Sequence, residues 1–156
     1  MRSNVGRFDK AGRIAIGVGL IGLAGISLGA FAQTSGAKTE KALFILTSDS
    51  LQTQGMSMVL ANAMAKQGTQ VNVLLCDNAG DLALKSTTSE PLKPMGATPE
   101  GLMMNLIKGG AQVKVCALYL PNKGASKEDL REGITVASPP EMAAMMGQQE
   151  TKVISN

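Results

Sequence analysis

Histidine and tryptophan are absent from the 156 residues of this chain, and tyrosine occurs once. Without histidine there is no Ser-His-Asp or Cys-His catalysis and no histidine-ligated metal site. Cysteine is also scarce, with two residues in the whole sequence. Any chemistry must therefore come from the thiols, carboxylates, lysines, hydroxyl groups, methionines or backbone amides.

An excess of positive charge is missing from most of the chain. The first 32 residues hold four basic side chains and one acidic side chain, a net charge of +3: Arg2, Arg7, Lys10, Arg13 and Asp9. From Gln33 onward, 11 basic and 11 acidic residues cancel. Beyond residue 32 the aromatic residues are Phe44 and Tyr119. Nucleic-acid binding needs clustered positive charge and, for single strands, aromatic stacking surfaces, so we predict no nucleic-acid partner.

The first 32 residues have the features of an export segment. Ile14 to Ala32 carries no charged residue, follows a basic stretch, and ends in Ala30-Phe31-Ala32, the small-x-small pattern of a signal-peptidase site. The run is also long enough for a minimal membrane span, and residues 4–13 resemble a small inner-membrane segment of bacterial proteins. We therefore expect either a cleaved signal peptide or a retained membrane anchor over residues 1–32. In both cases the following domain faces the periplasm, because the positive flank stays cytoplasmic.

After a flexible lead-in over residues 33–40, strand and helix patterns alternate through a single domain, 41–156. Short apolar, β-branched runs predict five strands, at residues 41–47, 70–76, 112–116, 134–137 and 151–155. Helical spacing and capping residues predict four main helices, at residues 52–66, 98–108, 126–133 and 138–146. We expect a turn at 77–80, a short helix at 81–84, and a loop with at most one helical turn at 117–125. This alternation predicts a three-layer α/β/α fold with a mainly parallel sheet of about five strands.

Both cysteines end a predicted strand, Cys76 the second and Cys116 the third. Binding and catalytic sites of open α/β sheets gather at the carboxyl ends of the strands. Lys114 and Lys123 lie near Cys116 in sequence, and a positive charge near a thiol favours the reactive thiolate. Two alternatives remain open: inert packing of the cysteines as small apolar residues, and a Cys76–Cys116 disulfide, which export permits.

Two segments carry a resemblance to a known family. The first is Leu43-Phe-Ile-Leu-Thr-Ser-Asp-Ser50, followed by a helix with small residues and Gly68-x-x-Val71-x-Val73. The second is Gly109-Gly-Ala-Gln-Val-Lys-Val-Cys116-Ala-Leu-Tyr-Leu-Pro-Asn-Lys-Gly124, followed by Gly133-Ile-Thr-Val136. Together they resemble the DsrE/DsrF-like family over nearly all of the chain after residue 32.

The resemblance implies an α/β domain that forms homo-oligomers or hetero-complexes, and a sulfane sulfur carried as a persulfide on Cys116. Sulfur donor and acceptor proteins would be its partners, with no cofactor and no metal. On this hypothesis the backbone N–H groups of Ala117 and Leu118 hold the anion, and Lys123 assists electrostatically. Asn122 and Gly124 would shape the pocket wall, and Cys76 is a possible second thiol. Export separates this chain from cytoplasmic sulfur-relay relatives, and Lys123 stands where many relatives have arginine.

Two further hypotheses compete with the sulfur carrier. The first is a non-catalytic DsrE-like module that assembles as an oligomer and binds a partner or small ligand. The second is copper binding by the ten methionines, although Met56 and Met58 would point to different faces of a helix. Ser48-Asp49-Ser50 lacks the glycine spacing of a phosphate loop, so we interpret it as a helix cap. The acidic residues are interpreted as turn and helix-start residues: Asp77, Asp81, Glu128, Asp129, Glu132 and Glu141.

Overall fold

The computed structural model describes residues 40–156. The predicted leader, 1–32, and the lead-in up to residue 39 lie outside the described residues. Five strands form one parallel sheet in the order β4-β3-β2-β1-β5. Their bounds are β1 Lys41–Leu46, β2 Gln70–Leu75, β3 Gln112–Cys116, β4 Ile134–Ala137 and β5 Thr151–Ser155. The predicted strands are therefore all present, each within a residue of its expected ends.

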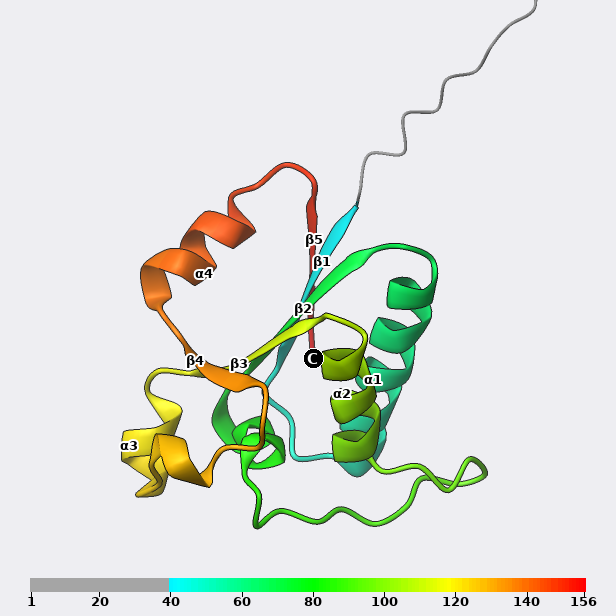
Figure 1. Cartoon of the computed structure of the whole chain (residues 1–156), viewed down its shortest axis with the longest axis vertical. Helices are drawn as coiled ribbons and strands as arrows, with labels where there is room; N and C mark the ends of the chain where they lie inside the picture. The colour runs from blue at the N-terminus through cyan, green and yellow to red at the C-terminus, as the bar shows by residue number, and fades with distance from the viewer. Residues whose placement is uncertain (1–39) are drawn as a thin grey trace, which may run out of the picture. The chain divides into compact units, whose positions relative to one another are not determined.

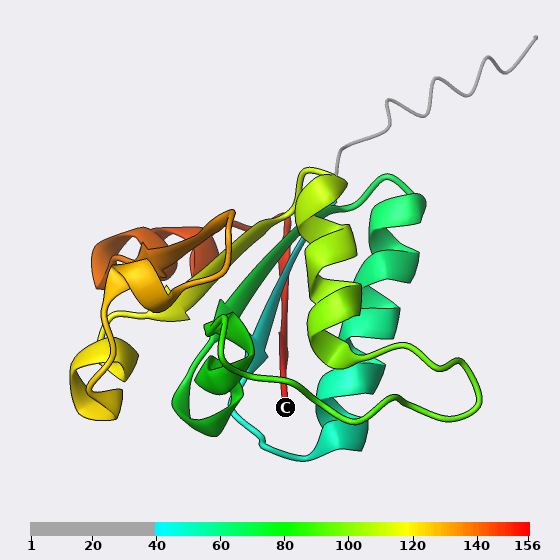
Figure 2. The same ribbon diagram turned by 60° about the horizontal axis from the view of Figure 1, so that its bottom comes forward.

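Helices cover both faces of this sheet. The helices α1 (Leu51–Lys66) and α2 (Pro99–Lys108) lie side by side on one face, and α4 (Pro139–Met146) lies on the other (Figure 1, Figure 2). Parallel strands run in the same direction, so each connection must carry the chain back to the end of the sheet where the strands begin. These helices form such connections. The predicted three-layer α/β/α fold with a parallel sheet is confirmed.

The two faces differ in how much apolar surface they bury. Phe44, Val73 and Val115 point toward α1 and α2 and belong to a large core that contains most of the buried side chains. On the opposite face a smaller group of four buried residues joins the sheet to α4, with Leu43, Leu74 and Ala137 from strands and Met142 from the helix. Successive residues of a strand point to opposite faces, so a strand buried on both sides is apolar throughout. This explains why the sequence of β1 has no polar alternation.

The helix starts follow the predicted capping residues. Ser50 caps α1, where its hydroxyl accepts a hydrogen bond from the backbone N–H of Thr53 at 3.4 Å. Thr98 caps α2 by accepting from the backbone N–H of Gly101 at 3.1 Å, and Pro99 occupies the first turn. A side-chain acceptor satisfies an N–H group that has no partner within the helix. The interpretation of Ser48-Asp49-Ser50 as a helix cap is confirmed.

Two short elements differ from the sequence predictions. Instead of a turn followed by a helix, one continuous 3₁₀ helix, η1 (Asp77–Ala83), follows β2 directly, because Asp77 turns the chain with a φ of 48° and Ala79 and Leu82 are then buried. The helix predicted over 126–133 shrinks to η2 (Lys127–Asp129). The Ser126–Asp129 capping box forms, but Leu130 then becomes extended and bridges to Leu84. Burying Leu130 ends this helix.

Residues 117–125 contain the single helical turn that the sequence allowed. Helix α3 (Tyr119–Lys123) follows β3 after two residues, and Gly124 ends it with a φ of 69°. A positive φ at the end of a helix favours glycine. Within residues 40–156 no helix has the length and apolar character needed to cross a membrane.

Candidate functional site

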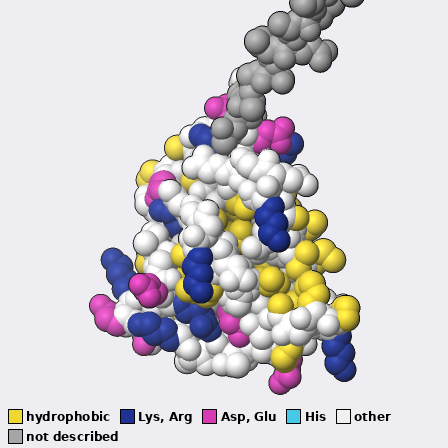
Figure 3. Space-filling view, turned by 45° about the vertical axis from the view of Figure 1, so that its right-hand side comes forward, with side chains coloured by type: hydrophobic (Ala, Val, Ile, Leu, Met, Phe, Trp, Pro, Cys, Tyr) yellow, Lys and Arg dark blue, Asp and Glu magenta, His cyan; other side chains and the backbone are white. Residues whose placement is uncertain are grey.

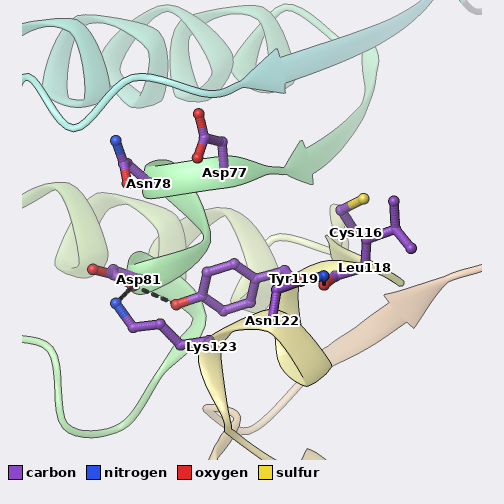
Figure 4. Close-up of a pocket in the computed structure, with 8 residues that line it drawn as sticks. All are labelled: Asp77, Asn78, Asp81, Cys116, Leu118, Tyr119, Asn122 and Lys123. Carbon is purple, nitrogen blue, oxygen red and sulfur yellow. Dashed lines mark hydrogen bonds and ion pairs between the residues drawn. The ribbon is translucent and has the colours of Figure 1, made fainter.

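A pocket lies at the carboxyl ends of β2 and β3, where η1 and α3 face each other (Figure 4). Its volume is about 390 Å³. The lining residues come from three parts of the fold: Asp77, Asn78 and Asp81 from η1, Cys116 from β3, and Leu118, Tyr119, Asn122 and Lys123 from the α3 segment. We call it the thiol pocket, because Cys116 is the nucleophilic side chain in its wall. Its position matches the expected site of an open α/β sheet.

The two cysteines lie at the same level of the sheet. Register pairs Leu75 of β2 with Val115 of β3, so the next residues, Cys76 and Cys116, are neighbours across the two strands. Cys76 is still extended and its backbone N–H donates to the carbonyl oxygen of Leu46 at 2.8 Å. Side chains at equivalent positions of parallel strands share one face of the sheet. Both cysteines are half-buried free thiols, so they are neighbours but do not form the Cys76–Cys116 disulfide in this structure.

The thiols differ in their surroundings. Burial raises the pKa of Cys76 to about 12, and a side-chain hydrogen bond with Cys116, the charge of Cys116 and the charge of Asp77 act in the same direction. Cys76 therefore keeps its proton at neutral pH. This arrangement favours Cys116, which lines the pocket, as the nucleophile.

A polar network ties the two walls of the pocket together. The carboxylate of Asp81 accepts a hydrogen bond from the hydroxyl of Tyr119 and pairs with the ammonium group of Lys123 at 2.7 Å (Figure 4). Burial alone would raise the pKa of Asp81, but hydrogen bonds from Lys123 and Tyr119, with the lysine's charge, hold it below its usual value. Burial and the hydrogen bond to Asp81 raise the pKa of Tyr119. Tyr119 is thus a neutral hydrogen-bond donor, and the network fixes α3 against η1.

The predicted site residues are partly brought together. Cys116, Leu118 and Lys123 all line the thiol pocket, with Leu118 immediately before α3. Ala117 connects β3 to this segment, and Gly124 closes α3 beyond the lining residues. Lys123 forms an ion pair with Asp81, so its positive charge in the pocket is partly neutralised by the carboxylate.

Lys114, which the sequence placed beside Cys116, points elsewhere. Its ammonium group pairs with Glu141 of α4 at 2.8 Å. Register pairs Lys114 with Thr135, and it pairs Cys116 with Ala137 two positions farther along both strands. Residues two positions apart on a strand share one face of the sheet, but the ion pair with Glu141 holds the Lys114 ammonium group at α4, outside the lining of the thiol pocket. This leaves Lys123 as the lysine that lines the thiol pocket.

Four lining residues were not recognised as site residues from the sequence: Asp77, Asn78, Asp81 and Tyr119. Asp81 was interpreted as a helix-start residue, and Asn78 as part of a turn. Tyr119 carried a usable signal, since it is the single tyrosine of the chain and follows Cys116 by three residues. The pairing of Asp81 with Tyr119 and Lys123 joins positions 38 and 42 residues apart, which local patterns do not encode.

Metal-binding groups are not assembled in the part of the chain that the structure describes. No cluster of three or more cysteine or acidic side chains suited to a metal ion occurs among residues 40–156. In α1, Met56 is 59% exposed and Met58 is 1% exposed, so the two thioethers face opposite sides. These two thioethers therefore do not form one soft-metal site.

The polar network predicts how two substitutions will change the reactivity of Cys116. Asp81→Asn removes a negative charge from the pocket and releases Lys123, so we expect alkylation of the reduced Cys116 thiol by iodoacetamide to accelerate about two- to threefold at low salt. Lys123→Met should slow it by a similar factor. Peptide mapping of the alkylated protein at fixed pH measures both rates. Lys127→Met, an exposed lysine outside the pocket, is the control; equal effects of Lys123→Met and Lys127→Met would contradict a local role.

Comparison with known proteins gives likenesses in structure. No protein-family model and no curated protein sequence matches the chain. The ychN protein from E. coli superimposes with a TM-score of 0.64 at 16% identity, covering 76% of this chain and 99% of that one. MTH1491 from Methanobacterium thermoautotrophicum, a protein of unknown function, gives 0.60 at 18% identity and covers 75% and 99% of the two chains.

A third solved structure is similar to the same extent. BT1422 from Bacteroides thetaiotaomicron, a conserved protein of unknown function, gives a TM-score of 0.59 at 17% identity and covers 75% of this chain and 95% of that one. Nearly the whole of each solved chain therefore matches the α/β domain. At these identities the likeness shows the fold alone, the α/β domain with a parallel sheet.

Proposed function

We propose that this protein handles sulfur in the periplasm by accepting a sulfane sulfur as a persulfide on Cys116 and passing it to an acceptor thiol. One observation carries the proposal: a half-buried cysteine lines a pocket at the carboxyl end of a parallel sheet, next to a protonated second thiol. A carrier needs a nucleophilic sulfur that a donor can reach, and needs no cofactor.

The transfer consists of two displacements at sulfur. The Cys116 thiolate attacks the outer sulfur of a donor persulfide, the donor's S–S bond breaks, and the donor leaves as a thiolate. An acceptor thiolate then attacks the outer sulfur of the Cys116 persulfide and returns Cys116 to its thiolate form. Neither displacement needs a general base once the thiolate is present, which suits a chain without histidine. The N–H groups of Ala117 and Leu118 and the Lys123 ammonium group are proposed to hold the anionic sulfur.

Export and oligomer formation belong to the same proposal. The uncharged run Ile14 to Ala32 behind a basic stretch supports delivery to the periplasm, by a cleaved signal peptide or a retained anchor. The outer side of α1 exposes the apolar side chains of Met56 and Leu60, 59% and 48% exposed. Figure 3 shows hydrophobic side chains gathered on the side of the domain where α1 lies. This surface supports self-association.

The carrier hypothesis is tested by intact mass. We expect the reduced protein, treated with one equivalent of a sulfane-sulfur donor and measured at once, to consume donor sulfur at Cys116. The product is a protein one sulfur atom heavier or one whose Cys116 thiol has been oxidised by that sulfur. Cys116→Ser should show neither change. Because serine is nearly isosteric with cysteine, the variant should keep the fold, which circular dichroism checks.

The competing hypothesis is a non-catalytic module on the same fold. The exposed apolar surface of α1 supports this hypothesis as much as it supports an oligomeric sulfur carrier. It predicts that donor treatment leaves both thiols of the wild-type protein free and its mass unchanged. That result would remove the sulfur-carrier function and leave an assembly or binding role. Sedimentation analysis of Leu60→Glu beside the wild type then determines whether the α1 surface joins copies of the chain.

A further inference from the structure

The second thiol has a position that the carrier function does not require. Cys76 is neither a distant core residue nor a bridged one, since the strand register places it beside Cys116 on the adjacent strand and both thiols are free. Neighbouring strands are about 4.8 Å apart. Cysteines can form a disulfide when their Cα atoms are about 4.4–6.8 Å apart. The pair therefore has the spacing for a disulfide while both thiols are free.

From this juxtaposition we infer that Cys76 is a resolving cysteine, which attacks the inner sulfur of a Cys116 persulfide, forms the Cys76–Cys116 disulfide and releases hydrosulfide. The inference rests on the proposed function, because it takes the Cys116 persulfide as its starting point. It adds an activity, the reductive release of sulfide from sulfane sulfur, and a second catalytic residue.

The step balances without an outside base. The persulfide on Cys116 enters as an anion with its charge on the outer sulfur, and Cys76 enters as a thiol. The proton of Cys76 moves to the outer sulfur as the Cys76 sulfur bonds to the Sγ of Cys116. The bond between Sγ and the outer sulfur breaks, and that sulfur leaves as HS⁻. Two cysteine sulfurs are thereby oxidised to a disulfide, and one sulfane sulfur is reduced to sulfide.

The surroundings of Cys76 suit a resolving thiol, and those of Cys116 suit the thiol that accepts sulfur. Its raised pKa keeps the proton on Cys76 in the resting protein, so it is available for the departing sulfur and Cys76 does not compete for the donor. Cys76 packs with Ile45 and with Met145 of α4 against the smaller core, whereas Cys116 lines the pocket that a donor enters. A cycle closes when a dithiol protein or a small thiol reduces the disulfide, in the manner of thiol–disulfide exchange.

The test treats the reduced full-length protein with one equivalent of glutathione persulfide and follows sulfide release and intact mass together. For the wild type we expect about one equivalent of sulfide per protein and a product two hydrogens lighter, with Cys76 and Cys116 joined in one peptide after digestion. Cys76→Ser should retain the added sulfur on Cys116 and release at least about tenfold less sulfide over the same time.

Each alternative outcome has a separate meaning. A wild-type protein that keeps its added sulfur as stably as Cys76→Ser overturns the resolving role and leaves the carrier intact. A wild-type protein that gains no sulfur, forms no disulfide and releases no sulfide overturns both the inference and the proposed function. If Cys76→Ser fails to fold, the wild-type digest still decides, because an unlinked Cys76 after full donor consumption contradicts the inference.

Discussion

Phe44→Ala should lower the free energy of unfolding by about 3–5 kcal/mol. Phe44 is fully buried in β1, second from one edge of the sheet, within the core shared with α1 and α2. Removing its ring deletes apolar contacts and leaves a cavity that a close-packed core cannot fill completely. Because domains are stable by only about 5–15 kcal/mol, this single change removes a large part of the total. Urea denaturation followed by far-UV circular dichroism measures the loss.

Met56→Ala provides the matched control. Met56 is a large apolar residue of α1, but it is 59% exposed. Its replacement removes little buried surface and should change stability by less than about 0.5 kcal/mol. If the two variants lost similar stability, the core described on the α1 and α2 face would be wrong. A loss below about 1 kcal/mol for Phe44→Ala would contradict it equally.

The sequence contained most of the fold because its signals are local. β-Branched and apolar runs such as Val71–Leu75 mark strands buried on two faces, and Ser50 and Thr98 mark helix starts by hydrogen bonds that close within three residues. Alternation of these elements leaves few topologies, and a parallel sheet is the common solution. The failures fall where tertiary contacts outweigh local preference, as at Leu130, whose burial beside Leu84 ends a helix that its capping box had started.

The candidate site was predicted to a smaller extent. The position of Cys116 at the end of its strand followed from the pattern, and the structure adds that the register brings Cys76 to its side. No sequence rule gives the relative level of two strands separated by a helix. The same holds for Asp81, because its role depends on η1 lying against α3. There its carboxylate binds the Tyr119 hydroxyl and the Lys123 ammonium group. Long-range pairing is thus the part of the site that residue patterns leave out.

The contact between Gly80 and Tyr119 gives the second large prediction. A methyl group on Gly80 would lie 2.3 Å from Cδ2 and 2.4 Å from Cε2 of the Tyr119 ring, far inside van der Waals contact. The ring is buried and its hydroxyl is bound to Asp81, so it cannot swing away without breaking that hydrogen bond. We expect Gly80→Ala to destabilise the domain by about 1–3 kcal/mol, the usual range for overpacking. Urea denaturation measures this loss.

Gly80→Ala should also disturb the thiol pocket, because the ring forms part of its wall and Asp81 follows Gly80 directly. A double-mutant cycle separates this clash from a general effect of alanine in η1. In a Tyr119→Leu background the smaller side chain leaves room for the methyl group, so Gly80→Ala should cost at least about 1 kcal/mol less than in the wild type. Additive losses would mean that the methyl group meets something other than the ring. Coupled losses, together with a changed alkylation rate at Cys116, would establish that the packing of one glycine against one tyrosine holds η1 and α3 at the spacing the thiol needs.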